Sequence, residues 1–308
     1  MLFTALSTSA DASVRSMAAV MVRKRVNKEM YTKLSPQAQA GVKQTLMTAV
    51  QNEPEASVRH KIADTTGEMA ALILEDGDWP EILPFVFTSS RAPSFALRES
   101  CLIIFSRLTF VVGDKLLAAM PQIKEMLMVT LADPESKEVR LAALNATASL
   151  VQALNETKDG SISALNDLIP NMVQVLTAAL NEKDEETARS AIEEFISVSE
   201  EVPKFFRRHL EPLVQMAIQI VTAQQLEDDT RFLAVELLVT LAEQAPSMMR
   251  KQAIFLQNMV PLALQLMLTV DEVDMAEWNS TTEDDDDTDM TSIDVGKVGE
   301  WENYVVFA

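Results

Sequence analysis

Apolar residues recur at helical spacing along most of the chain. The clearest case is residues 160–201, where two apolar stripes are separated by a polar run at 181–184. The first stripe consists of Ile162, Leu165, Leu168, Ile169, Met172, Val175, Leu176 and Leu180. Residues three and four positions apart lie on one face of an α-helix, so this segment predicts two amphipathic helices joined by a short loop.

The same two-helix pattern predicts nearly the whole order of elements. A helix at about 11–27 is followed by helix pairs at about 36–74, 79–112, 114–155, 160–201 and 203–245, and by an unpaired helix at about 247–270. We name the first helix of each pair A and the second B. Glycine is limited to 7 residues, which also favours helix over tight turns.

Two sets of markers recur about every 40 residues and turn this pattern into a repeat. An arginine lies near the start of each B helix, at spacings of 44, 39, 42, 49 and 42 residues, and a proline lies in the A helices. The arginines are Arg15, Arg59, Arg98, Arg140, Arg189 and Arg231, and the prolines are Pro84, Pro121, Pro170, Pro212 and Pro261. A helix-pair period of this length predicts an all-α HEAT-repeat α-solenoid, a right-handed superhelix of antiparallel helix pairs that is incomplete at both ends, over residues 1–270.

The marker arginines are expected to be structural. Acids stand four residues before Arg15, Arg59, Arg189 and Arg231, where an i,i+4 ion pair adds a few tenths of a kcal/mol. We predict that the arginines tie one repeat to its neighbour; a direct ligand contact by one of them is the alternative. Pro170 falls inside its predicted A helix and should kink it, because proline removes a backbone donor.

The charge of the chain is strongly acidic and unevenly placed. The formal net charge is -20, and residues 271–308 hold 13 acids and one lysine. Such a balance argues against DNA or RNA as the main partner, because nucleic-acid affinity depends on neutralising phosphates with basic side chains. It suits basic protein partners.

No group of residues indicates catalysis or a cofactor. The sequence has no Gly-rich phosphate loop, no nucleophile constellation and no Cys/His set with zinc spacing, so we predict neither an enzyme nor a bound cofactor or metal. The one cysteine, Cys101, lies in an apolar run and is expected to be a buried, reduced thiol. No stretch predicts a membrane span.

An acidic stretch stands where the next marker arginine is expected. Residues 271–289 carry ten acids and no base. Such runs are usually solvated, disordered tails, but the position of this one after the A helix at 247–270 predicts an inter-helix loop, 271–294, that clamps a basic protein surface. Its candidate contact residues are Asp271, Glu272, Asp274, Glu277, Trp278, Glu283, Asp284, Asp285, Asp286 and Asp287.

Several stretches carry a family resemblance, and the most specific are 202–211 and Ala276-Glu277-Trp278 within its acids. The others are 13–23, 57–69, 79–81, 96–99 and 233–243. On these residues the chain resembles the N-terminal part of the importin-β superfamily of nuclear transport receptors, in particular its Ran-binding importin-five branch. The resemblance covers roughly residues 2–290 and implies family repeats two to eight, the first and last incomplete.

The resemblance implies a nuclear import receptor that shuttles between cytoplasm and nucleus. It implies as partners Ran in its GTP form, Phe-Gly nucleoporins, and cargo with basic nuclear localisation signals that Ran-GTP releases. By position, the loop around Trp278 matches a loop that contacts Ran or basic cargo. The B helices at 11–27, 55–74 and 94–111 match part of the Ran site, and zones near 114–130, 162–180 and 204–222 match the Phe-Gly contacts. We expect a monomer.

The alternative is a HEAT-repeat scaffold that assembles other proteins, such as the scaffold subunit of a phosphatase. Such scaffolds are regular from end to end, so an acidic loop anchored by Trp278 favours the receptor. Residues 295–308 match no part of the family and are expected to be disordered. Our hypothesis for them is intron read-through, because Gly296-Lys297-Val298 is what a splice-donor sequence can encode.

Overall fold

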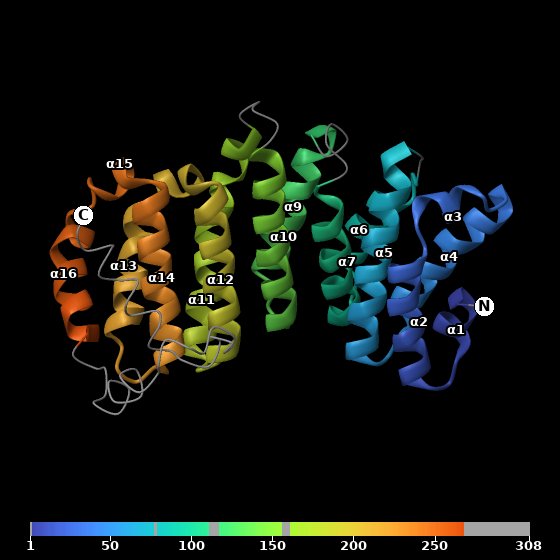
Figure 1. The fold of residues 1–308 in the computed structure, drawn as a ribbon, viewed down its shortest axis with the longest axis horizontal. Coiled ribbons are helices and arrows are strands. Elements are labelled where there is room, and N and C mark those ends of the chain that lie inside the picture. The colour runs from blue at the N-terminus through green and yellow to red at the C-terminus, as the bar shows by residue number, and fades with distance from the viewer. Residues whose placement is uncertain (1, 77–78, 111–116, 156–160, 268–308) are drawn as a thin grey trace, which may run out of the picture. The chain divides into compact units, whose positions relative to one another are not determined.

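The computed structural model describes residues 2–76, 79–110, 117–155 and 161–267, and every regular element in these ranges is a helix (Figure 1). They form two compact units, Met1–Arg208 and the residues from His209 onward. In the first unit the helices are α1 Leu2–Thr8, α2 Ala12–Arg25, α3 Lys28–Thr32, α4 Pro36–Asn52, α5 Ala56–Asp76, α6 Ile82–Ser89, α7 Phe95–Leu108, α9 Met120–Leu131, α10 Lys137–Asn155, η1 Ser161–Leu168, α11 Ile169–Asn181, α12 Glu185–Glu201 and η2 Pro203–Arg208. In the second they are α13 Leu210–Thr222, α14 Asp228–Gln244, α15 Pro246–Met249 and α16 Ala253–Met267.

The helices alternate between two rows, as the periodicity predicts. In the first unit the B helices α2, α5, α7, α10 and α12 each pack on the next (Figure 1). We call these five helices the B row. The A helices α4, α6, α9 and α11 pair with α5, α7, α10 and α12 in turn. The prediction of an all-α fold of repeated helix pairs is confirmed.

The centre of the B row is buried on nearly all sides, because each B helix contacts both of its neighbours in the row and its own A helix. In α7, which lies between α5 and α10, Phe95 and Arg107 are exposed, Ala96, Leu97 and Ile103 are half-buried, and all other residues are buried. Gly67 of α5 permits the close approach of α7, since a Cβ atom there would lie 2.7 Å from Cβ of Arg107. A larger side chain at this position would push the two helices apart.

Aromatic packing closes the last repeat of the first unit. The rings of Phe195 and Phe206 lie 5.7 Å apart, and those of Phe205 and Phe206 lie 5.3 Å apart in an edge-to-face arrangement. All three are buried. Burial of large aromatic side chains supplies much of the stability of a core, so this cluster anchors η2 onto α12.

Proline begins helices here more often than it kinks them, which corrects the prediction for Pro170. Pro170 lies in the first turn of α11, directly after the 3-10 segment η1. Pro121 likewise lies in the first turn of α9. The first turn has no acceptor for its N–H groups, so a residue without an N–H costs nothing there. Pro261, in contrast, does lie inside α16.

The short helix α3 was not predicted. Its N-cap Asn27 accepts a hydrogen bond from the N–H of Met30, and Tyr31 is buried. None of the described helices is long and apolar enough to cross a lipid bilayer.

Candidate functional site

Arg15 and Glu53 join the first two repeats of the described chain. Nε and Nη2 of Arg15 each donate to one carboxylate oxygen of Glu53 at 2.7 Å, a two-pronged geometry that is among the stronger side-chain contacts. Glu53 caps the end of α4, in the neighbouring repeat. The hydrogen bond from Arg15 lowers the pKa of Glu53 against the opposing effect of burial. The Asp11 side chain, the partner expected from sequence, instead caps α2 through the N–H of Ser13.

Arg98 and Asp133 repeat this arrangement two junctions further on. Nε and Nη2 of Arg98 donate to Asp133 at 2.8 and 3.1 Å, and Nη2 also meets Glu135 at 2.8 Å. Burial would raise the pKa of Asp133, but hydrogen bonds from Arg98 and from the N–H groups of Glu135 and Ser136 outweigh it and lower the pKa. We call such an arginine with its two-pronged acid from the next repeat a clamp.

Two further marker arginines, Arg140 and Arg231, make other contacts. Arg140 reaches Glu182, at the end of α11, with Nη2 at 3.3 Å. Arg231 pairs with Asp228, three residues away, with Nη1 2.7 Å from Oδ1. Arg231 also donates to the carbonyl of Val221, in its own repeat.

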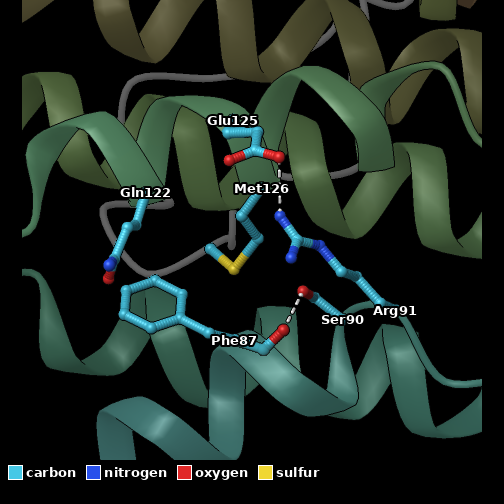
Figure 2. Close-up of a pocket in the computed structure, with 6 residues that line it drawn as sticks. All are labelled: Phe87, Ser90, Arg91, Gln122, Glu125 and Met126. Atoms are coloured by element: carbon cyan, nitrogen blue, oxygen red, sulfur yellow. Dashed lines mark hydrogen bonds and ion pairs between the residues drawn. The ribbon is translucent and has the colours of Figure 1, made fainter.

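A pocket of about 270 Å³ lies between two successive A helices, α6 and α9 (Figure 2). Phe87 and Met126 form its apolar floor, and Ser90 and Gln122 stand at its sides. An ion pair between Arg91 and Glu125, 2.8 Å long and exposed, bridges the two helices across the rim. The six residues that line the pocket are Phe87, Ser90, Arg91, Gln122, Glu125 and Met126. Its mixture of apolar and polar lining residues suits one apolar side chain with polar groups around it.

The B row carries a charged cluster that spans three helices. Oδ1 of Asp64 in α5 lies 3.0 Å from Nη2 of Arg107 in α7. Nη1 of Arg23 in α2 lies 3.8 Å from Oδ2 of Asp64 and 3.8 Å from Oε1 of Glu68. Arg107 is half exposed. The positions of these groups on α2, α5 and α7 place them on the helices for which the resemblance implies Ran contacts.

A polar contact joins the later helices of the B row. Asn145 of α10 donates to Glu194 of α12 at 2.7 Å. Burial raises the pKa of Glu194, with a smaller lowering from that hydrogen bond. No group of His, Cys, Asp and Glu in the described part of the chain has the arrangement of a metal site. The acidic loop candidates from Asp271 to Asp287, the tail 295–308 and part of the predicted unpaired helix lie outside the described residues.

Comparison with known proteins bears on this arrangement. A family profile described as "IPO5-like, TPR repeats" matches residues 54–216, and one described as "Importin repeat" matches residues 223–299. The chain belongs to the importin-5-like family. A probable importin-5 homolog from Dictyostelium discoideum is 29% identical over 294 residues, which cover 92% of this chain and 27% of that protein. Importin subunit beta-3 from Saccharomyces cerevisiae is 24% identical over 296 residues, or 92% of this chain and 26% of its own.

Solved structures agree with the family assignment. This importin-5-like chain matches Kap121p with a TM-score of 0.80 at 24% identity, over 99% of this chain and 28% of that one. It matches Kap121p bound to RanGTP with a TM-score of 0.75 at 26% identity, over 94% of this chain and 26% of that one. The HEAT-repeat solenoid predicted from the repeat is thereby confirmed. The chain spans about a quarter of the length of these relatives.

Proposed function

We propose that this chain is the part of a nuclear import receptor that binds Ran in its GTP form. The observation that carries the proposal is the match, over 94% of the chain, to Kap121p bound to RanGTP. The charged cluster of Arg23, Asp64, Glu68 and Arg107 supports it, because it lies on the three B helices implied by the resemblance. In the full receptor Ran-GTP would then release the cargo.

The first experiment compares binding of Ran loaded with GTP and with GDP, at low and at physiological salt. We expect the chain to bind Ran loaded with GTP more tightly than Ran loaded with GDP. Arg107→Glu should weaken this binding, because it reverses the charge of a half-exposed side chain that would contact an oppositely charged group of Ran. The matched control is Arg91→Glu, the same charge change at an exposed residue on the side of the A helices. Equal binding of both forms, or equal loss in both variants, would favour the scaffold alternative.

The acidic loop is a second part of the same proposal. Ten acids in residues 271–289 would attract a basic surface of Ran or cargo, with a range of about 8 Å at physiological salt. Neutralising Asp284, Asp285, Asp286 and Asp287 to asparagine should weaken binding most at low salt. An effect that is the same at all salt concentrations would argue against an electrostatic role for the loop.

The pocket between α6 and α9 is our candidate contact for Phe-Gly nucleoporins. It coincides with the first expected zone, 114–130, because α9 supplies Gln122, Glu125 and Met126. Solved relatives include Kap121p bound to Nup53p and to Pho4p, which supports partners of the nucleoporin and cargo kinds. A fluorescently tagged full-length receptor should shuttle between cytoplasm and nucleus; retention in one compartment would contradict the proposal.

A further inference from the structure

The carboxylate of each clamp accepts hydrogen bonds from two different groups. Besides holding the arginine of the preceding repeat, Glu53 accepts a hydrogen bond from the N–H of Glu55 at 3.1 Å. Asp133 accepts one from the N–H of Glu135 at 3.0 Å. In both repeats the carboxylate therefore lies between a guanidinium from one side and the backbone at the start of a B helix from the other.

The junction between the two clamped ones lacks this carboxylate. Each clamp acid is followed by proline, in Glu53-Pro54-Glu55 and Asp133-Pro134-Glu135, and the corresponding segment of the intervening repeat is Ala92-Pro93-Ser94. Ala92 thus supplies a methyl group where its counterparts supply a carboxylate. The arginine that faces this place is Arg59, by its position in the marker series.

Arg59 is oriented like the clamp arginines. Nη1 of Arg15 donates to the carbonyls of Ser9 and Ala10, six and five residues back. Nη1 of Arg98 makes the same two contacts, with Ala92 and Pro93. Nη1 of Arg59 also lies near the carbonyls six and five residues back, those of Glu53 and Pro54, at 3.5 Å each.

By analogy with the two clamps, we infer from the shared placement of Nη1 that Nε of Arg59 lies on the side of the missing carboxylate. In both clamps Nε is the atom that donates to the acid. Arg59 is only 6% exposed, and its buried Nε has no acceptor among the described residues. A buried donor without an acceptor loses the hydration it would have in the unfolded chain. An acceptor supplied from outside these residues would therefore stabilise Nε of Arg59.

The start of α7 supplies a second hydrogen-bond donor, the backbone N–H of Ser94. Ser94 is the N-cap of the 14-residue helix α7 and forms no capping bond with its side chain. Its N–H corresponds to the N–H of Glu55 and Glu135, which donate to the clamp acids. Among the described residues the N–H of Ser94 makes no backbone–backbone hydrogen bond, and Ser94 is exposed to solvent. The N-terminus of a helix of this length favours negative charge.

Two further charged side chains bear on Arg59. Nη2 of Arg59 lies 3.6 Å from the buried carboxylate of Glu99, too far for a good hydrogen bond. That carboxylate is held more closely by Nε2 of His60, at 2.8 Å. Because Glu99 is shared in this way, it does not replace the two-pronged acid of the clamps. Arg91, next to Ala92, is exposed and is paired with Glu125 at 2.8 Å.

We propose that Arg59 and the N-terminus of α7 form an anion site that takes the carboxylate of an aspartate or glutamate side chain from a partner protein. Pro93 and Ser94 are exposed and Ala92 is half-buried, so a partner can approach along the loop that they form. The carboxylate would accept from Nε of Arg59 and from the N–H of Ser94, as Glu53 does from its counterparts. This site lies at the start of α7, whereas the charged cluster proposed for Ran includes Arg107 near the end of the same helix.

The test is a titration followed by NMR of the Arg59 Nε–H and the Ser94 amide. Three ligands are compared in the whole chain at constant ionic strength: acetate, a blocked tripeptide with a central aspartate, and the same peptide with asparagine. We expect saturable shifts of both signals with the aspartate peptide, at lower concentration than with acetate, and none with the asparagine peptide. Acetate binding as tightly as the peptide would point to a free carboxylate as the ligand and overturn the assignment to a partner side chain.

Internal and matched controls make the test decisive. The Nε–H groups of Arg15 and Arg98 are already paired and should not shift. Ala92→Glu places a carboxylate of the chain itself in the site, so it should abolish the shifts. Ala92→Gln has a side chain of similar size without the charge, so it should only reduce them. No saturable shift of Arg59 Nε–H with either carboxylate ligand, or equal shifts in wild type and in Ala92→Glu, would overturn the proposal.

Discussion

Arg98 holds Asp133 across a repeat junction with two nearly parallel hydrogen bonds, of 2.8 and 3.1 Å, although 35 residues separate them in sequence. Both residues are buried. Removing one partner of a buried pair leaves the other charge without compensation, and this is far more destabilising than loss of a surface pair. The clamp is therefore a fixed point of the fold.

Loss of this clamp should be costly. We expect Arg98→Ala to lower the free energy of unfolding by about 3–5 kcal/mol, measured by urea denaturation. The matched control is Arg91→Ala, which removes an arginine from an exposed ion pair with Glu125 and should cost less than about 1 kcal/mol. Equal losses in the two variants would show that burial of Asp133 does not matter.

The clamp acids should make the protein sensitive to low pH. The pKa values of Glu53 and Asp133 are lowered on folding, from ordinary values of 4.5 and 3.8. A depressed folded-state pKa contributes stability above the ordinary pKa, and this contribution is lost as the pH falls through the folded-state pKa. We expect the urea midpoint to fall between about pH 5 and pH 3, and to fall less in a Glu53→Gln, Asp133→Asn double variant. An unchanged slope would place the acid sensitivity elsewhere.

Two helical glycines should respond oppositely to alanine. A Cβ atom on Gly67 would lie 2.7 Å from Cβ of Arg107 and 3.3 Å from the carbonyl oxygen of Ile104, so Gly67→Ala must separate α5 from α7. We expect a loss of about 1–3 kcal/mol. A Cβ atom on Gly41 of α4 would meet nothing within 4 Å, so Gly41→Ala should stabilise by about 0.5–1 kcal/mol through helix propensity. Thermal unfolding of the two variants provides the comparison.

The pocket between α6 and α9 offers a test by aromatic truncation. If Phe87 forms part of a contact for a Phe-Gly segment, Phe87→Ala should weaken binding of a Phe-Gly repeat peptide about tenfold, equivalent to about 1.4 kcal/mol. Thr88→Ala changes the exposed neighbour of Phe87 and should leave binding unchanged. Circular dichroism would check that both variants stay folded. Equal affinities for wild type and Phe87→Ala would rule out this pocket as the contact.

The one cysteine should be inert in the folded protein. Cys101 is fully buried, and burial raises the pKa of its thiol, with smaller opposing contributions from Arg98 and from backbone N–H groups. Alkylation requires the thiolate and access to it. We expect iodoacetamide to label the chain at a rate that follows unfolding, so that labelling rises steeply near the urea midpoint. Rapid labelling in native buffer would show that α7 is open to solvent.

The order of the long helices follows from the sequence alone, because helical periodicity is a local property of neighbouring residues, whereas the short helices α3 and α15 were not predicted as separate elements. The predicted B helix at about 11–27 is observed as α2, Ala12–Arg25, and the predicted pair at about 160–201 ends with α12, Glu185–Glu201. The recurrence of arginine and proline is enough to identify a solenoid, since each repeat can bury its apolar face only against the next.

Partner choice at the junctions depends on the tertiary structure. The sequence pattern directs Arg15 to Asp11, four residues away, but stacking of the repeats brings Glu53, 38 residues away, to a better two-pronged geometry. The same stacking leaves Nε of Arg59 buried without an acceptor among the described residues, and it brings Phe87 and Met126 to one pocket. Contacts over such separations depend on how rigid helices are stacked, which no local pattern specifies.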